Sequence, residues 1–125
     1  MFLTKIVQQN FKKLQSDQLL AFGELTQIAK VFSELKTKDF EKNIKNLLVK
    51  LDQSGGGSKP SKLFLNFSML LSVINQRTKH VVFREVVYEK LASSKSKVFV
   101  KNVVEALERS EEDVYSVIYD NKGHN

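Results

Sequence analysis

The sequence predicts a mainly α-helical protein with two segments that share one core: a three-helix bundle, and a second segment that combines helices with a short β-hairpin. Two observations support this fold class. Apolar residues recur at three- and four-residue steps over most of the chain, which is the period of an amphipathic helix. The chain has 125 residues, of which 42% are hydrophobic, so it is long enough to bury the core of a single domain.

The first segment, residues 1–53, is expected to form a small antiparallel bundle. Helices are predicted over residues 2–15, 17–36 and 38–52, and each carries an apolar stripe on one face. Polar residues that can cap the second and third helices lie directly before or at their starts: Ser16, Asp17 and Thr37. The joints between the predicted helices are very short, which favours antiparallel neighbours.

A glycine-rich stretch separates the two segments. Residues 54–58, Ser-Gly-Gly-Gly-Ser, hold three of the chain's five glycines, and such a run has few side chains to bury and high backbone entropy. Residues 54–59 are therefore expected to be a flexible linker. Their composition indicates an engineered joint that either replaces a loop or tethers two separate pieces, and a native linker is the alternative.

The second segment, residues 60–125, alternates predicted helices with two short β-branched runs. Pro60 suits the first turn of a helix over residues 60–76. The elements predicted after it are a strand at 80–82, a helix at 83–91, a turn at 93–97, a helix at 98–109, a strand at 113–119 and a turn at 120–123. The helix at 98–109 is expected to bury five apolar side chains: Phe99, Val100, Val103, Val104 and Leu107. In an all-helical alternative, residues 110–113 form a capping box and 111–119 a last helix.

This order of elements is that of a winged helix, a helix-turn-helix with a β-hairpin wing. The chain from Leu63 to Leu107 resembles the C-terminal winged-helix domains of origin-recognition AAA+ proteins. The features that are similar are the apolar run Leu63-Phe64-Leu65, the turn with Thr78-Lys79 and the helix with Val87-Tyr88. The related silent-information-regulator branch fits equally well. The resemblance covers about half of the chain and implies a nuclear protein of a chromatin or replication assembly. The sequence ends at Asn125, so the returning strand of the wing is expected to be missing or supplied by another segment.

The charge of the chain, +6 at pH 7, favours acidic partners such as nucleic acid, and a solvated lysine-rich surface is the alternative. The predicted recognition helix, once its apolar positions are removed, exposes five polar residues: Lys101, Asn102, Glu105, Glu108 and Arg109. Its two carboxylates would face phosphates, which counts against base reading in the major groove. Six cations remain as candidate contacts to a phosphate backbone or an acidic partner: Arg77, Lys79, Lys95, Lys97, Lys101 and Lys122.

No residue pattern in the chain indicates catalysis. The sequence contains no cysteine and two histidines, His80 and His124. It has no catalytic Ser-His-Asp order, no phosphate-binding glycine loop and no spacing of metal ligands. The protein is therefore expected to be a non-enzyme that uses no cofactor, metal or small-molecule substrate.

The sequence supports one function hypothesis and one alternative. The first is a non-catalytic module for protein–protein interaction or homodimerisation in a DNA-associated assembly. The alternative is a winged-helix domain that binds nucleic acid directly through basic edge residues. The chain has no run of about 18 uncharged apolar residues and no signal peptide at its start, so we expect no membrane partner and an intracellular location. The resemblance to winged-helix domains implies that this location is the nucleus.

Overall fold

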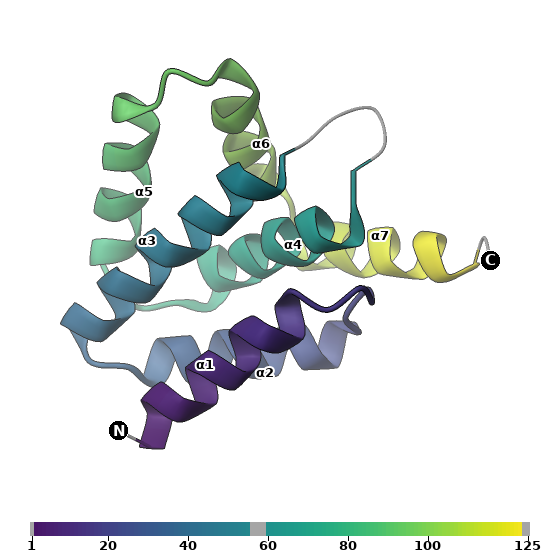
Figure 1. Ribbon diagram of the computed structural model, residues 1–125, viewed down its shortest axis with the longest axis horizontal. Helices are drawn as coiled ribbons and strands as arrows, with labels where there is room; N and C mark the ends of the chain where they lie inside the picture. Colours follow the sequence, from purple (N-terminus) through teal and green to yellow (C-terminus); the bar gives the residue numbers. More distant parts are fainter. Residues whose placement is uncertain (1, 56–59, 124–125) are drawn as a thin grey trace.

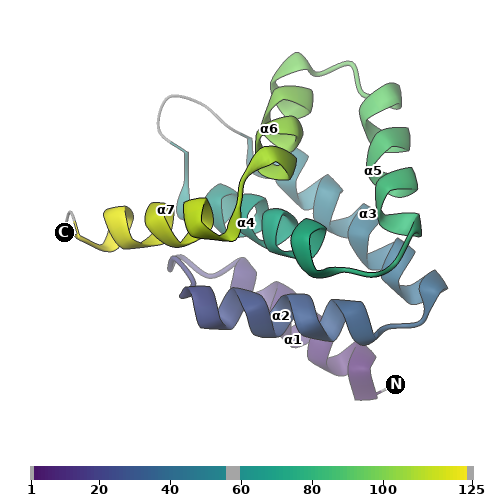
Figure 2. The same ribbon diagram turned by 180° about the vertical axis from the view of Figure 1, so that it is seen from behind.

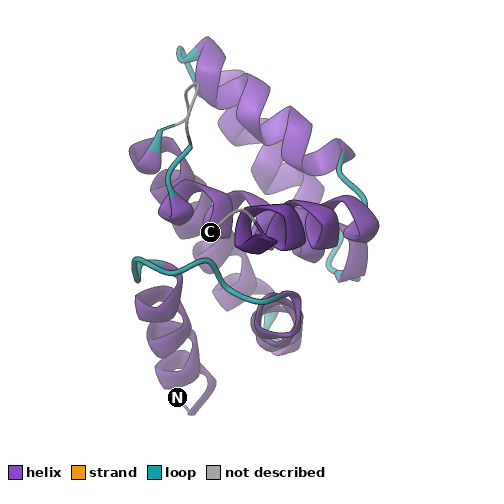
Figure 3. Ribbon diagram, turned by 90° about the vertical axis from the view of Figure 1, so that its right-hand side faces the viewer, coloured by secondary structure: helices purple, strands orange, loops and turns teal. Residues whose placement is uncertain are grey.

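The computed structural model describes the backbone of residues 2–55 and 60–123, and the side chains of residues 5–55 and 60–120. These ranges contain helices and connecting loops, and no strand (Figures 1 and 3). The helices are α1 (Phe2–Leu14), α2 (Phe22–Glu34), α3 (Thr37–Ser54), α4 (Lys62–Arg77), α5 (Val82–Ser93), α6 (Lys97–Glu108) and α7 (Glu111–Gly123). The mainly α-helical fold class is confirmed in its all-helical form. None of the described helices is both long and apolar enough to cross a membrane.

Both predicted strands are wrong, and the described residues contain no β-hairpin wing. Val82, predicted to lie in the strand at 80–82, is the first residue of α5, and the Phe83 N–H donates to the His80 carbonyl at 3.1 Å. A lone strand leaves its backbone N–H and C=O groups without partners unless a second strand pairs with it. The described residues offer no second strand, whereas the helix satisfies its own backbone and buries Phe83 and Val86.

Residues 113–119, predicted as the other strand, lie within α7. Ser110 and Asp113 form the reciprocal capping box of the all-helical alternative, with each side chain accepting from the other's N–H at 3.0 Å. Val114 is buried and its neighbour Tyr115 is 57% exposed, and the same pair of environments recurs four residues later at Ile118 and Tyr119. The pattern of buried and exposed residues over 113–119 therefore has a period close to four, which is helical, although β-branched and aromatic residues are typical of strands.

Several helix boundaries also differ from those predicted. α2 begins at Phe22 rather than 17, because Leu20 is buried within the α1–α2 connection instead of continuing a helix. Thr37 lies inside α3 rather than capping it. Pro60 precedes α4, whose N-terminal cap is Ser61, with its Oγ accepting from the Phe64 N–H at 3.1 Å. α3 continues through Ser54, into the predicted linker, and residues 56–59 of that linker lie outside the described residues.

The central element of the fold is α4. Helices α1, α2, α3, α6 and α7 all pack against it, and α5 packs against α3 (Figures 1 and 2). The ten residues of α4 that are buried include the polar Asn66, Ser68 and Ser72. Buried residues from both sides of the glycine-rich stretch belong to one hydrophobic cluster.

Asn66 joins the middle of α4 to the connection between α1 and α2. Its side chain is fully buried, and its Oδ1 accepts from the Leu20 N–H at 2.9 Å. Its Nδ2 donates to the carbonyls of Leu14, at 3.2 Å, and Gln18, at 2.8 Å. One amide thus satisfies the last carbonyl of α1 and two backbone groups of the connection.

The C-terminal half of α4 performs the same task for the end of α6. The Ser72 hydroxyl donates to the Ala106 carbonyl at 2.8 Å, and Asn75 Nδ2 donates to the Leu107 carbonyl at 3.1 Å. The last carbonyls of a helix have no partner within that helix. Polar side chains on α4 therefore stabilise the end of α6 and set its position against the core.

Candidate functional site

The predicted contact cations lie in two places rather than on one surface. Arg77 and Lys79 lie at the connection between α4 and α5, and Lys95, Lys97 and Lys101 lie at the turn between α5 and α6 and on the first turns of α6. All five are exposed. Helix α5 has 12 residues, about 18 Å of helix, and it separates the two groups (Figure 1). No single contact patch is therefore made by these residues, and the side chain of Lys122 lies outside the described part of the chain.

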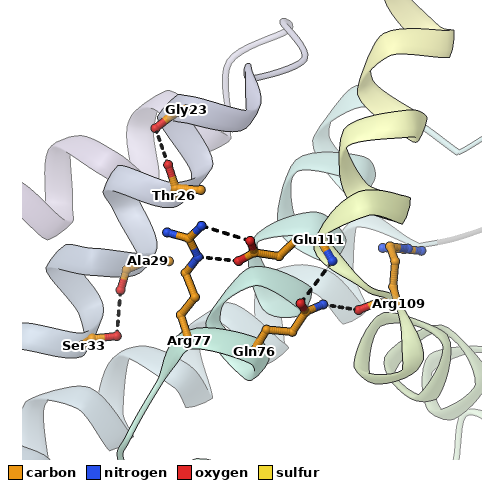
Figure 4. A network of polar contacts seen from close by, with 8 residues as sticks. All are labelled: Gly23, Thr26, Ala29, Ser33, Gln76, Arg77, Arg109 and Glu111. Carbon is orange, nitrogen blue, oxygen red and sulfur yellow. Dashed lines mark hydrogen bonds and ion pairs between the residues drawn. The ribbon is translucent and has the colours of Figure 1, made fainter.

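Arg77 is engaged in an ion pair with Glu111 at the start of α7. Its Nε and Nη2 both donate to the carboxylate, the latter at 3.0 Å (Figure 4). This hydrogen bond is the main reason that the pKa of Arg77 is raised and the pKa of Glu111 is lowered from their ordinary values. Gln76 completes the connection, because its amide donates to the Arg109 carbonyl and its Oε1 accepts from the Glu111 N–H at 3.1 Å.

Replacing Glu111 by Gln is expected to remove a pH-dependent part of the stability. A carboxyl whose pKa is lowered on folding stabilises the folded state above its ordinary pKa, here 4.5, and loses this effect as the pH falls through the folded-state pKa. Both partners are partly exposed, so solvent screening limits the difference at pH 7 to about 0.2–1 kcal/mol. Urea unfolding of the unmodified protein and the variant, at pH 7 and at successively lower pH, measures this difference in the free energy of unfolding. The matched control is Glu112→Gln, because Glu112 is exposed and forms no ion pair with any described residue. A stability difference for Glu111→Gln that persists unchanged in acid would contradict the expectation.

Arg109, predicted to be exposed on the recognition helix, instead folds back onto α4. Its Nη1 donates to the hydroxyls of Ser68, at 3.0 Å, and Ser72, at 3.3 Å. Burial of the guanidinium lowers the pKa of Arg109 from its ordinary value, and the nearby carboxylates of Glu105 and Asp113 oppose this effect. The Arg109 side chain therefore acts in packing, while the predicted exposure of Lys101 and Glu105 is confirmed.

A groove of about 290 Å³ lies between α5 and α6. Helix α5 packs on α3 and α6 packs on α4, so the two helices stand apart, joined by the turn at 94–96 (Figure 2). Residues of α5 and α6 line the groove, together with Asn75 of α4: Phe83, Arg84, Val87, Tyr88, Leu91, Val104, Leu107 and Glu108. Tyr88 is 56% exposed and Val104 is 38% exposed. The groove thus presents apolar surface to solvent from two opposing helices.

The prediction that α6 buries all five of its apolar residues is wrong for Val104. The buried face of α6 carries Phe99, Val103 and Ala106. Val104 lies on a second stripe with the half-buried Val100 and Leu107, about 100° around the helix. The sequence indicates two apolar stripes on this helix, and one helix face cannot hold both sets of positions. Which stripe faces the core is a tertiary property.

A second groove, of about 450 Å³, lies between α1 and α3. Lys12, Lys42 and Lys50 stand among its lining residues, and the remainder are mostly amides. Its apolar lining residues, Val7 and Phe11, are almost completely buried. This groove therefore offers no exposed apolar side chain to a partner, whereas the one between α5 and α6 offers Tyr88 and Val104.

Comparison of the chain with family models, curated proteins and solved structures finds no match. The function is therefore inferred from the surfaces themselves.

Proposed function

We propose that the protein is a non-catalytic protein-interaction module and that the groove between α5 and α6 binds an amphipathic helix of a partner protein. The observation that carries this proposal is the exposure of Tyr88 and Val104 on facing walls of that groove. Contiguous exposed apolar surface in a groove is typical of sites that bind another protein.

The walls of the groove have the spacing that helix-in-groove recognition uses. Arg84, Tyr88 and Leu91, the lining residues of α5 that are not buried, recur at four- and three-residue steps, a distance of about 11 Å along the helix. A partner helix with apolar side chains at i, i+3 or i+4, and i+7 matches a stripe of this length. Tyr88 supplies the kind of large, half-exposed aromatic side chain that often dominates the energy of an interface.

The end of the groove opposite the turn at 94–96 adds polar selectivity. Arg84 and Glu108 lie among its lining residues, so a partner helix with one acidic and one basic residue beside its apolar stripe can pair with both. We assign the partner to a DNA-associated, nuclear assembly, an assignment that rests on the resemblance to winged-helix domains. A second copy of this chain is the alternative occupant.

Selection of helical peptides from a display library tests the groove directly. Peptides selected on the unmodified protein are expected to carry the i, i+3 or i+4, i+7 apolar pattern. Val104→Lys places a charge in the groove and should weaken their binding by at least about tenfold, equivalent to about 1.4 kcal/mol. Fluorescence anisotropy with labelled peptides measures this change.

Val98→Lys is the matched control, because Val98 is an exposed valine of the same helix that does not line the groove. It should leave peptide affinity within about twofold. Equal binding to the unmodified protein and both variants would contradict the proposal. Light scattering identifies the occupant: a concentration-dependent dimer that Val104→Lys abolishes would assign the groove to a second copy of the chain.

A further inference from the structure

A second surface, at the connection between α4 and α5, has a different chemical character. Three cavities of about 330, 340 and 290 Å³ adjoin there. Ser33 and Arg77 line both the first and the second, and Lys79 and His80 line both the second and the third. They form one continuous trough from α2, across the connection, to the start of α5. In Figure 2, α2 runs below α4 toward this connection.

We define the cationic trough by the residues that line these three cavities. They are Thr26, Gln27, Lys30, Ser33, Asn75, Arg77, Thr78, Lys79, His80, Val81, Phe83 and Arg84. Four of them are cations from α2, α4, the connection and α5, and none is a carboxylate. Arg77 is neutralised by Glu111, whereas Lys30, Lys79 and Arg84 form no ion pair with any described residue. Like charges gathered without counter-charges in a hollow create a positive potential there.

The backbone at the centre of the trough is held in place by specific contacts. The His80 ring stacks on Phe40 of α3, with ring centroids 4.2 Å apart, and its Nε2 lies 3.1 Å from the Ser33 carbonyl oxygen. The His80 N–H donates to the Thr78 hydroxyl at 3.2 Å. These contacts tie the connection to α2 and α3, so the cations are presented on a preformed surface and little ordering is needed on binding.

We propose that the cationic trough binds the phosphodiester backbone of duplex nucleic acid without reading its base sequence. The unpaired cations are distributed along the trough, which suits a polymer with charges at regular intervals rather than a single anion. The one phenyl ring in the lining, Phe83, is 2% exposed, so it offers no face for the base stacking that single strands use. Apart from Val81, which is 81% exposed, and the buried Phe83, the lining side chains are polar or charged, so the trough has no apolar stripe for an acidic amphipathic helix.

The trough is a different surface from the groove between α5 and α6, and the two share Asn75, Phe83 and Arg84 where they meet. The proposal does not depend on the proposed protein partner. It also differs from base reading by α6, because no residue of α6 lines the trough. Arg84 is left unchanged in the test below, so that the result reports on the trough alone.

The test compares two double variants that remove equal charge. Lys30→Gln with Lys79→Gln alters the trough, and Lys97→Gln with Lys101→Gln alters α6; all four lysines are exposed. The probe is a mixed-sequence DNA duplex of about 20 base pairs, titrated by fluorescence anisotropy between about 50 and 200 mM salt. The logarithm of the affinity should fall linearly with the logarithm of the salt concentration. The trough variant should reduce that slope by about 2 and weaken binding about ten- to hundredfold at 0.1 M salt.

The α6 variant should keep the slope of the unmodified protein, and a second duplex of unrelated sequence should bind equally well. Four results overturn the proposal: no binding of duplex at about 50 mM salt, equal losses in the two double variants, a marked sequence preference, or tighter binding of polyglutamate than of a duplex of equal charge. The last result would assign the trough to an acidic protein segment. Thermal melting of both double variants confirms that they remain folded.

Discussion

Replacing Phe67 by Ala is expected to lower the free energy of unfolding by about 3–5 kcal/mol. Phe67 lies on α4 and is 1% exposed, within the cluster that includes residues from both segments. Leu47→Ala, at a fully buried position of α3, should cost about 2–5 kcal/mol, because it also leaves a cavity that the neighbours fill only in part. Since each segment alone buries little surface, either substitution should shift one cooperative thermal transition of the whole protein.

Val98→Ala is the control for these truncations, because Val98 is 56% exposed and its replacement should change stability by no more than about 0.5 kcal/mol. Chemical denaturation followed by circular dichroism measures all three variants. Two separate transitions, with Leu47→Ala moving one and Phe67→Ala moving the other, would show that the segments fold independently on either side of the linker.

Replacing Asn66 by Ala should have the second largest effect, a loss of about 2–5 kcal/mol. The amide serves the N–H of Leu20 and the carbonyls of Leu14 and Gln18, and each buried polar group left without a partner costs about 1–3 kcal/mol. The α1–α2 connection loses its anchor at the same time. Hydrogen exchange should therefore show reduced protection in that connection and in the adjoining end of α1.

Two further variants separate the hydrogen bonds from the lost volume. Asn66→Leu fills the space without restoring any of the three bonds, so it should remain strongly destabilised. Asn46→Ala removes an exposed amide of α3 and should be nearly neutral. Stability of Asn66→Leu close to that of the unmodified protein would show that apolar packing, and not the amide, holds the connection.

Most of the helices could be predicted from the sequence because their signal is local. The stripe of α3, with Phe40, Ile44 and Leu47, has a period that any amphipathic helix shows, and all three residues are buried. The two predicted strands are wrong because strand formation depends on distant residues and not on a local signal. Short β-branched runs such as 80–82 and 113–119 favour a strand only if another strand pairs with them, and the chain supplies helical packing partners instead.

The candidate surfaces were predictable only in part. The sequence predicts Arg77 and Lys79 as contacts to a phosphate backbone or an acidic partner, and both line the cationic trough. Lys30 and Arg84 were missed, because Lys30 is 47 residues from Arg77 along the chain and no local pattern links them. Tyr88 belongs to the residues that resemble winged-helix domains, but its exposure in a groove depends on where α6 lies.

The sequence by itself determined that the chain is helical, where most of its helices lie and that the surface carries excess positive charge. These properties follow from side-chain period and composition, which depend on neighbours a few residues apart. Only the tertiary structure decided that Asn66 anchors a loop 46 residues away, that Val104 faces a groove instead of the core, and that cations of α2 and α5 share one trough. Each of these depends on packing around α4, because contacts between distant segments are selected by the fit of whole helices and not by any local pattern.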